Sequence, residues 1–246
     1  MAEGKKVALI TGANRGLGFE TAKQLGEKGV TVILGSRKLI DAEAAAAKLK
    51  AEGIDAYGIQ LDVTKPTDRT AATKFIEEHF GKLDILINNA GIASSEGFGT
   101  NTTTRTTEQE LRSVFETNVF SVVLVTQELL PLLKKSDAGR IVNLSSILGS
   151  LTLHADPKSP IAAFKNFSYD ASKAALNAFT IHLADELKDT PLKVNSVHPG
   201  WVKTELGTSA APMEIPDGAK TGVEAALLGP DGPNGRFFHL GQELPW

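Results

Sequence analysis

Two side chains that could transfer a proton, Tyr169 and Lys173, stand four residues apart in the segment Tyr-Asp-Ala-Ser-Lys. Four residues is just over one turn of an α-helix, so a helix here places the phenol and the ammonium on one face. A phenol with a pKa of ~10 donates poorly at neutral pH, but a cation within ~4–6 Å favours the phenolate and lowers that pKa. The pair predicts a general acid or base, although helices also carry such pairs on solvated faces by chance.

A glycine-rich segment, Thr-Gly-Ala-Asn-Arg-Gly-Leu-Gly, occupies positions 11–18. It lies between a predicted strand and a predicted helix, where missing side chains let a diphosphate approach the backbone and the amino end of the helix. The alternative is that the glycines only make a tight turn. Under the first interpretation, the residues that bind the nucleotide are Gly12, Asn14, Arg15, Gly16, Leu17 and Gly18.

The elements that must position these residues follow from the hydrophobic pattern. Short apolar runs alternate with amphipathic stretches, which is typical of repeated βα units and a parallel sheet. The predicted strands are 7–11, 31–35, 56–60, 85–88, 140–145, 193–198 and 237–240. The predicted helices are 17–28, 41–51, 67–80, 108–134, 169–188 and 218–228. Right-handed crossovers then give an α/β fold, a doubly wound parallel sheet of about seven strands with helices on both faces.

Ligands of such sheets bind at the carboxyl ends of the strands. At the end of the second predicted strand stand Ser36 and Arg37, where folds that prefer NAD carry an acidic residue and an arginine accommodates the 2′-phosphate of NADP. Arg15 could supply a second guanidinium, which suits a phosphate dianion. The sequence therefore favours NADPH; the alternative is that both arginines are solvated surface residues.

Further candidates for binding the nucleotide follow the third and fourth predicted strands. Asp62, between Leu61 and Val63, could accept a hydrogen bond from the adenine amino group. Asn89, Ala90 and Gly91 follow the fourth predicted strand and leave room for the adenine ribose. Both segments could instead be turns, because Asn, Asp and Gly favour turns for local reasons.

Composition narrows the class of protein. A chain of 246 residues suits one α/β domain, so we expect a single domain over 1–246. With 26 Lys and Arg against 29 Asp and Glu, nucleic acid and membrane surfaces are not expected partners. Cysteine is absent, which excludes disulfides and thiolate nucleophiles, and the five histidines lack ligand spacing, so no metal is expected. The apolar run near the amino end is far shorter than a signal segment, so we expect a cytoplasmic protein.

With these motifs assembled, the chain resembles the short-chain dehydrogenase/reductase family. The resemblance runs from about residue 5 to the end and adds Asn118, Ser146, Pro199, Gly200 and Thr204 to the set. The tail 235–246 resembles that of monomeric carbonyl reductases within the family. The resemblance implies a Rossmann fold, NADPH/NADP+ as cofactor and a small carbonyl or alcohol substrate.

The resemblance also implies a role for each catalytic residue. Tyr169 delivers a proton to the carbonyl oxygen while hydride moves from the nicotinamide to the carbonyl carbon. Lys173 holds the nicotinamide ribose and lowers the phenol pKa, and Ser146 positions the substrate oxygen. Asn118 holds a water that links Lys173 to solvent. Ser146 is preferred to Ser145 because, in the family, the catalytic serine directly precedes an aliphatic-x-Gly segment.

The nicotinamide and substrate ends of the site are implied less directly. Pro199, Gly200, Val202 and Thr204 would surround the nicotinamide carboxamide. The segment 205–217 is rich in small residues and predicts a lid over the substrate. Candidates for an apolar substrate pocket, each of which is more often a packing residue, are Leu148, Leu153, Trp201, Met213 and Phe98, with Trp246 closing the site from the tail.

One departure from the family pattern lies between Ser146 and Tyr169, where about ten extra residues form an insertion at about 152–168. An insertion is commonly a plain surface loop. In carbonyl reductases that share it, the insertion covers the helix face that relatives use to form tetramers. We therefore expect a monomer, with a homo-oligomer as the alternative.

The leading hypothesis is an NADPH-dependent oxidoreductase that reduces an apolar ketone or aldehyde reversibly. A 3-oxoacyl thioester reductase or a ketosteroid reductase would use the same residues. A protein that senses NADPH without turnover is a hypothesis from a different class. Sensors of that kind usually lose the tyrosine and lysine pair, and this chain keeps both Tyr169 and Lys173.

Overall fold

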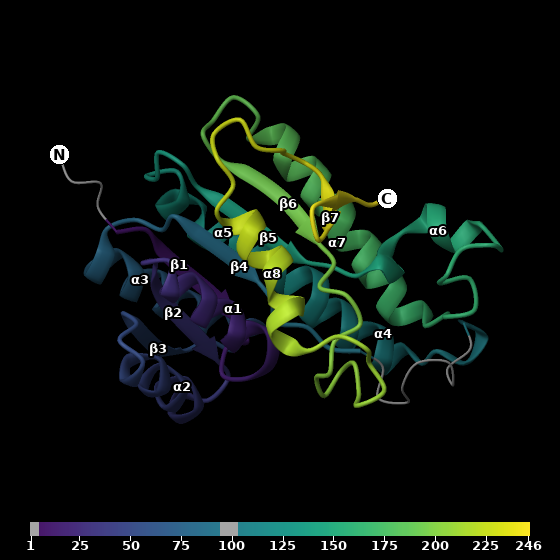
Figure 1. The fold of residues 1–246 in the computed structure, drawn as a ribbon, viewed down its shortest axis with the longest axis horizontal. Helices are drawn as coiled ribbons and strands as arrows, with labels where there is room; N and C mark the ends of the chain where they lie inside the picture. Colours follow the sequence, from purple (N-terminus) through teal and green to yellow (C-terminus); the bar gives the residue numbers. More distant parts are fainter. Residues whose placement is uncertain (1–4, 94–102) are drawn as a thin grey trace.

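One sheet of eight strands forms the centre of the molecule, in the order β3-β2-β1-β4-β5-β6-β7-β8 (Figure 1). The computed structural model describes residues 5–93 and 103–246. The first seven strands pair in parallel, and the short last strand runs antiparallel to its neighbour. The strands are β1 Val7–Thr11, β2 Thr31–Ser36, β3 Ala56–Gln60, β4 Ile85–Asn88, β5 Arg140–Leu144, β6 Lys193–Val197, β7 Phe237–His239 and β8 Gln242–Glu243.

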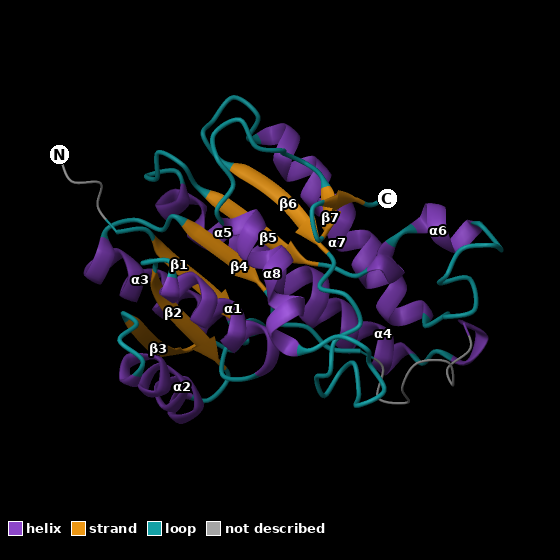
Figure 2. Ribbon diagram, viewed as in Figure 1, coloured by secondary structure: helices purple, strands orange, loops and turns teal. Residues whose placement is uncertain are grey.

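Helices cover both faces of this sheet (Figure 2). The α-helices are α1 Gly16–Glu27, α2 Leu39–Ala51, α3 Pro66–Phe80, α4 Glu108–Phe115, α5 Ser121–Leu133, α6 Leu151–Ala155, α7 Phe167–Glu186 and α8 Ile215–Ala226. Single turns of other helix types are η1 Thr103–Arg105, the π-turn η2 Glu116–Phe120 and η3 Ile147–Gly149. The doubly wound parallel sheet predicted from the sequence is thus confirmed.

Alternation along the strands divides the core into two layers. On β1, Val7 and Leu9 pack with α3, α5 and α7, whereas Ala8 and Ile10 pack with α1, α2 and α8. Successive strand residues face opposite sides of a sheet, so a strand buried on both faces must be apolar throughout. That requirement is why the strands could be recognised as continuous hydrophobic runs.

The seven predicted strands are present, and their ends differ from the prediction by at most one residue. The strand missed is β8, which is only two residues long and gives no periodic pattern. The predicted helix 108–134 is interrupted at η2, and α7 begins at Phe167, ahead of the predicted start at Tyr169. Helix α8 begins at Ile215, so the irregular part of the predicted lid is 205–214.

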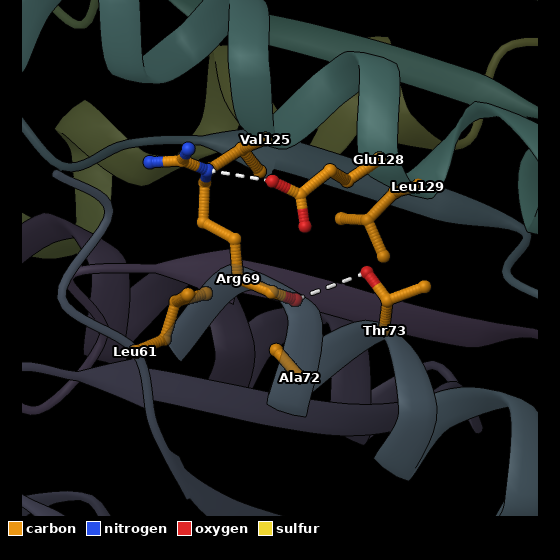
Figure 3. A pocket seen from close by; sticks show the side chains of 7 residues that line it. All are labelled: Leu61, Arg69, Ala72, Thr73, Val125, Glu128 and Leu129. Carbon is orange, nitrogen blue, oxygen red and sulfur yellow. Dashed lines mark hydrogen bonds and ion pairs between the residues drawn. The ribbon is translucent and has the colours of Figure 1, made fainter. Parts of the chain in front are cut away.

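A half-buried ion pair joins α3 to α5 beneath the nucleotide half. The Arg69 Nε donates to Glu128 Oε1 over 2.9 Å, and its Nη1 donates to the Val63 carbonyl over 3.0 Å. Figure 3 shows the two side chains facing each other across a shallow depression lined by Leu61, Ala72, Thr73, Val125 and Leu129. Arg69 therefore supports the segment after β3, which is predicted to contact adenine.

Replacing Arg69 by Met should destabilise the protein by roughly 1–3 kcal/mol, because the Val63 carbonyl loses its side-chain donor and the Glu128 carboxylate keeps only the Thr70 hydroxyl among the described residues. The Arg69 side chain is 6% exposed. The matched control is Lys135→Met, whose pair with Glu77 also bridges α3 and the end of α5 but is 50% and 60% exposed. The control should change the free energy of unfolding by less than about 0.5 kcal/mol. Urea unfolding measures both, and equal losses would contradict the account.

Candidate active site

The two residues of the proposed acid/base pair lie on the first turns of α7. Both Tyr169 and Lys173 are buried, and the Lys173 ammonium is 5.6 Å from the centre of the Tyr169 ring. The Lys173 Nζ donates to the carbonyl of Leu144, the last residue of β5, over 2.7 Å. Helical spacing therefore brings phenol and ammonium together at the carboxyl edge of the sheet, as the sequence predicts.

Burial decides the protonation of this pair in the protein alone. It raises the pKa of Tyr169 to about 12, with the Ser146 hydrogen bond lowering it and the charge of Asp170 raising it. Burial also lowers the pKa of Lys173 to about 8. The expectation that the lysine brings the pKa of the phenol near neutrality is therefore not met in this structure, because burial is the largest cause and raises that pKa. Tyr169 keeps its proton at neutral pH, which is the state a proton donor needs.

Asn118 connects the segment after β4 to α7. Its Oδ1 accepts from the Ile92 N–H over 2.9 Å, and its Nδ2 donates to the Ile92 carbonyl over 2.8 Å and to Ser172 Oγ over 3.0 Å. The residue lies in the π-turn η2, and such turns inside helices are frequent at functional sites. Asn118 thus holds the neighbour of Gly91 next to the helix that carries Lys173.

The two adjacent serines after β5 have different surroundings. The Ser146 hydroxyl accepts from the Leu148 N–H over 3.2 Å and hydrogen-bonds the Tyr169 side chain. The Ser145 Oγ is buried and has no hydrogen-bond partner within the described residues. Ser146 is therefore in contact with the phenol, and the Ser145 hydroxyl is enclosed by the protein. Ser145, and not Ser146, is among the residues that line the cleft described next.

A cleft of about 1300 Å³ runs along the carboxyl ends of the strands. The predicted residues that line it are Gly12, Asn14, Arg15, Gly16, Leu17, Gly18, Ser36, Arg37, Leu61, Asp62, Val63, Asn89, Ala90, Gly91, Tyr169, Lys173, Pro199 and Thr204. One cleft thus joins the glycine-rich turn to the proposed acid/base pair, Tyr169 and Lys173. Sequence reasoning missed Lys38, Asp41, Thr64, Lys65, Ile92, Ser113, Glu116, Thr117, Leu144 and Lys203. Ser145, set aside in favour of Ser146, also lines the cleft, as do Glu205, Leu206 and Ile215 of the predicted lid.

Some of the missed residues carried a usable signal and others did not. Lys38, Thr64 and Ile92 each directly follow a predicted segment, so extending those segments by one residue would have found them. Ser113 and Thr117 come from the end of α4 and from η2. Their approach to the cleft depends on helix packing, which a local motif does not specify.

The glycine-rich turn fits a dinucleotide. A side chain on Gly18 would place its Cβ 2.6 Å from the Gly12 carbonyl, and Gly12 itself has a left-handed φ of 64°. Asn89 stabilises the turn, since its Nδ2 donates to the Thr11 and Gly12 carbonyls over 2.7 and 3.1 Å. The turn leads directly into α1, whose amino-terminal N–H groups suit a diphosphate.

Cationic groups line the end of the cleft beside β2. Arg37, Lys38 and Lys65 contribute from the ends of β2 and β3, and all are exposed. Arg15 pairs with Glu205 over 2.5 Å from the opposite wall. A phosphate at this end would meet guanidinium and ammonium groups, which suits the 2′-phosphate of NADPH.

Among the described residues, those predicted individually for the nicotinamide and substrate end, apart from Pro199 and Thr204, do not line this cleft, and neither do Asn118 and Ser146. Gly200, at φ 92°, leaves room for the Met213 side chain, and buried Val202 pairs with Met213 through a β-bridge. Trp201 is 51% exposed, and its Nε1 donates to the Gly207 carbonyl over 2.6 Å. Phe98 lies outside the described residues.

The other substrate candidates lie on the insertion and the tail. Leu148 and Leu153 belong to η3 and α6 and are partly buried. Trp246 stacks on Phe237 with ring centres 5.6 Å apart, and its carbonyl accepts from the Thr152 N–H over 3.0 Å. The tail is thereby joined to the start of the insertion.

The chain matches the family model described as short chain dehydrogenase over residues 6–215. The chain belongs to the short-chain dehydrogenase family. A relative named short-chain dehydrogenase anuI, from Penicillium roqueforti, is 38% identical and covers 92% of this chain and 90% of its own. Salutaridine reductase of Papaver bracteatum is 34% identical, with 95% and 94% covered.

A solved structure gives the same family assignment. The NADPH-bound carbonyl reductase from chicken fatty liver superposes on this short-chain dehydrogenase with a TM-score of 0.85. It is 28% identical in sequence, and 98% of this chain and 99% of that chain are covered. Among the described residues of this short-chain dehydrogenase, no helix combines the length and the apolar character that crossing a bilayer requires.

A substitution at Gly149 tests how closely the segment after Ser146 must approach α7. A Cβ at this position would lie 2.8 Å from the Lys173 carbonyl carbon and 2.9 Å from its Cβ. Gly149→Ala should therefore displace α7 or η3, with a cost of about 1–3 kcal/mol from overpacking. The control Gly222→Ala, inside α8 with open space around it, should stabilise by about 0.5–1 kcal/mol. Thermal unfolding that moved both variants in one direction would contradict this packing.

Proposed function

We propose that this short-chain dehydrogenase is an NADPH-dependent reductase of ketone or aldehyde carbonyls. The observation that carries the proposal is the buried Tyr169 phenol, which keeps its proton, hydrogen-bonds Ser146 and lines the cleft. The names of the relatives, salutaridine reductase and carbonyl reductase, support the same class of reaction.

Each proposed role rests on a contact of the chain. NADPH, when bound, supplies the hydride; the protein supplies orientation and the proton. Ser146 and Tyr169 together would hold the substrate oxygen, and Tyr169 would give it the proton. Lys173, fixed by the Leu144 carbonyl, is a buried cation beside the phenol and stabilises the phenolate that forms when the proton leaves.

Asn118 would position the segment after β4, because its amide oxygen and its amide nitrogen both hydrogen-bond the Ile92 backbone beside Gly91. Gly200, Val202 and Thr204 would border the nicotinamide, with Leu148, Leu153, Trp201 and Met213 on the substrate side. Reduction of a 3-oxoacyl thioester or a ketosteroid stays an alternative within this reaction class. The expected single domain over 1–246, monomer and cytoplasmic location stay predictions.

Tyr169→Phe tests the proposed proton donor. We expect turnover of NADPH with a panel of ketones and aldehydes, followed at 340 nm, to fall by about 10²–10⁴-fold, because only the hydroxyl is removed. Binding of NADPH, measured by fluorescence, should be kept. The chain has one other tyrosine, Tyr57, on β3 beneath Phe75 and Phe80, which makes Tyr57→Phe a matched control. A Tyr169→Phe enzyme as active as the control would reject the role.

Arg37→Asp tests the cofactor assignment. Removing a guanidinium from a phosphate costs about 1.5–3 kcal/mol, so KM for NADPH should rise by roughly 10- to 100-fold while KM for NADH changes little. Arg236→Asp, an equal charge change at an exposed position next to β7, is the control. If KM rose equally for NADPH and NADH, the 2′-phosphate would not be held through Arg37.

A further inference from the structure

The insertion between the catalytic serine and tyrosine folds against both catalytic segments. His154, in α6, places its Nε2 2.9 Å from the Leu148 carbonyl and 3.4 Å from Asp170 Oδ2. Leu148 donates its N–H to Ser146, and Asp170 directly follows Tyr169. One imidazole therefore contacts the segment of the serine and the helix turn of the tyrosine.

The protonation of His154 follows from its neighbours. The Lys165 Nζ lies 2.9 Å from His154 Nδ1 and 2.9 Å from the His154 carbonyl. An ammonium can only donate, so Nδ1 accepts and the ring proton resides on Nε2. Nε2 then donates to the Leu148 carbonyl, and the Asp170 carboxylate lies 3.4 Å from Nε2 as a second polar contact. Burial and the charge of Lys165 lower the pKa of His154, which keeps the ring in this neutral form.

Asp170 stabilises the turn that carries the phenol. Its Oδ2 accepts from the Asn166 N–H over 2.8 Å, while the Asn166 side chain accepts from the Tyr169 N–H over 3.4 Å. The two residues thus cap the first turn of α7 reciprocally, in the manner of a capping box. The Asp170 side chain is 12% exposed, and burial raises its pKa to about 7.

Other ionisable groups meet this cluster from the neighbouring elements. From α4, Glu110 hydrogen-bonds Ser168, one residue before Tyr169. Among the described residues, the ionisable groups that contact the cluster are Lys165, which lies against His154, and Tyr169, whose pKa is raised by the charge of Asp170, with Glu110 reaching it through Ser168.

We propose that His154 and Asp170 are positioning residues for the reaction. His154, oriented by Lys165, fixes the Ser146 segment against the first turn of α7, and Asp170 holds that turn and sets the electrostatic field at the phenol. The insertion is therefore a brace for the serine and the tyrosine, beyond any effect on assembly. Its effect on turnover rests on the proposed carbonyl reduction.

Turnover tests the histidine. Loss of the brace should misplace Ser146 relative to Tyr169, so His154→Ala should lower kcat by about 10- to 100-fold with NADPH affinity kept. His154→Gln, whose amide can still donate to the Leu148 carbonyl, should recover part of kcat. Lys165→Met should also lower kcat, because it removes the ammonium that holds His154 through its Nδ1 and its carbonyl.

His182→Ala, at an exposed position on α7, is the matched control and should keep the parent's kcat. Circular dichroism checks that each variant is folded. A folded His154→Ala variant with the parent's kcat would overturn the role of His154. An equal loss in His182→Ala would overturn it too, because any histidine change on these elements would then suffice.

The proposed effect of Asp170 on Tyr169 can be tested without turnover, from the absorbance of the Tyr169 phenolate. In a Tyr57→Phe background, Tyr169 is the single tyrosine, so alkaline titration reports its ionisation alone. Asp170→Asn keeps an acceptor for the Asn166 N–H but removes the charge that raises the Tyr169 pKa. Phenolate should therefore form at lower pH than in the background, within the range where circular dichroism shows a folded chain.

Asp185→Asn, an exposed change farther along α7, is the control and should titrate like the background. If Asp170→Asn also titrates like the background, the role of Asp170 is overturned. A parent protein inert toward every carbonyl would reject the proposed function. The titration would still decide whether Asp170 acts on Tyr169, so the two failures can be told apart.

Discussion

The site depends on the burial of two ionisable side chains, the Tyr169 phenol and the Lys173 ammonium, away from water. Tyr169 and Lys173 are both buried, and burial raises the pKa of the phenol and lowers the pKa of the ammonium, which favours the neutral form of each. In the proposed reaction, charge that forms on the phenol would be stabilised by groups already in place, chiefly the Lys173 ammonium and the Ser146 hydroxyl. A solvated pair at the same spacing would gain much less, because water screens the interaction.

A buried polar network holds the strands beneath this pair in register. Asn88 on β4 donates to Asn143 on β5 over 2.9 Å, and Asn143 donates to Thr180 on α7 over 2.8 Å. The Thr180 hydroxyl in turn bonds Ser196 on β6 over 2.8 Å. Such a network is costly unless every member finds its partner, so it favours one arrangement of these strands and α7. The tyrosine and lysine are thereby placed relative to the strand ends.

The sequence was sufficient for those parts of the site that depend on local pattern. The strand ends were predicted to within a residue because strands buried on both faces are continuous apolar runs. Tyr169 and Lys173 share a face because helical spacing alone requires it. The glycine-rich turn and Arg37 line the cleft because each follows a parallel strand, and all such ends meet at one edge.

What the sequence did not give depends on contacts between distant segments. No local pattern indicates that the helix predicted over 108–134 contains a π-turn at Asn118, whose amide pairs with the distant Ile92 backbone. Similarly, His154 and Asp170 are ordinary residues of an insertion and a helix until the fold brings them within 3.4 Å. The insertion contacts both the segment that carries Ser146 and the helix turn that carries Tyr169. It therefore constrains these two segments more strongly than a plain loop would, because each contact limits the positions of the serine and the tyrosine together. The extra residues between Ser146 and Tyr169 thus add rigidity to the site.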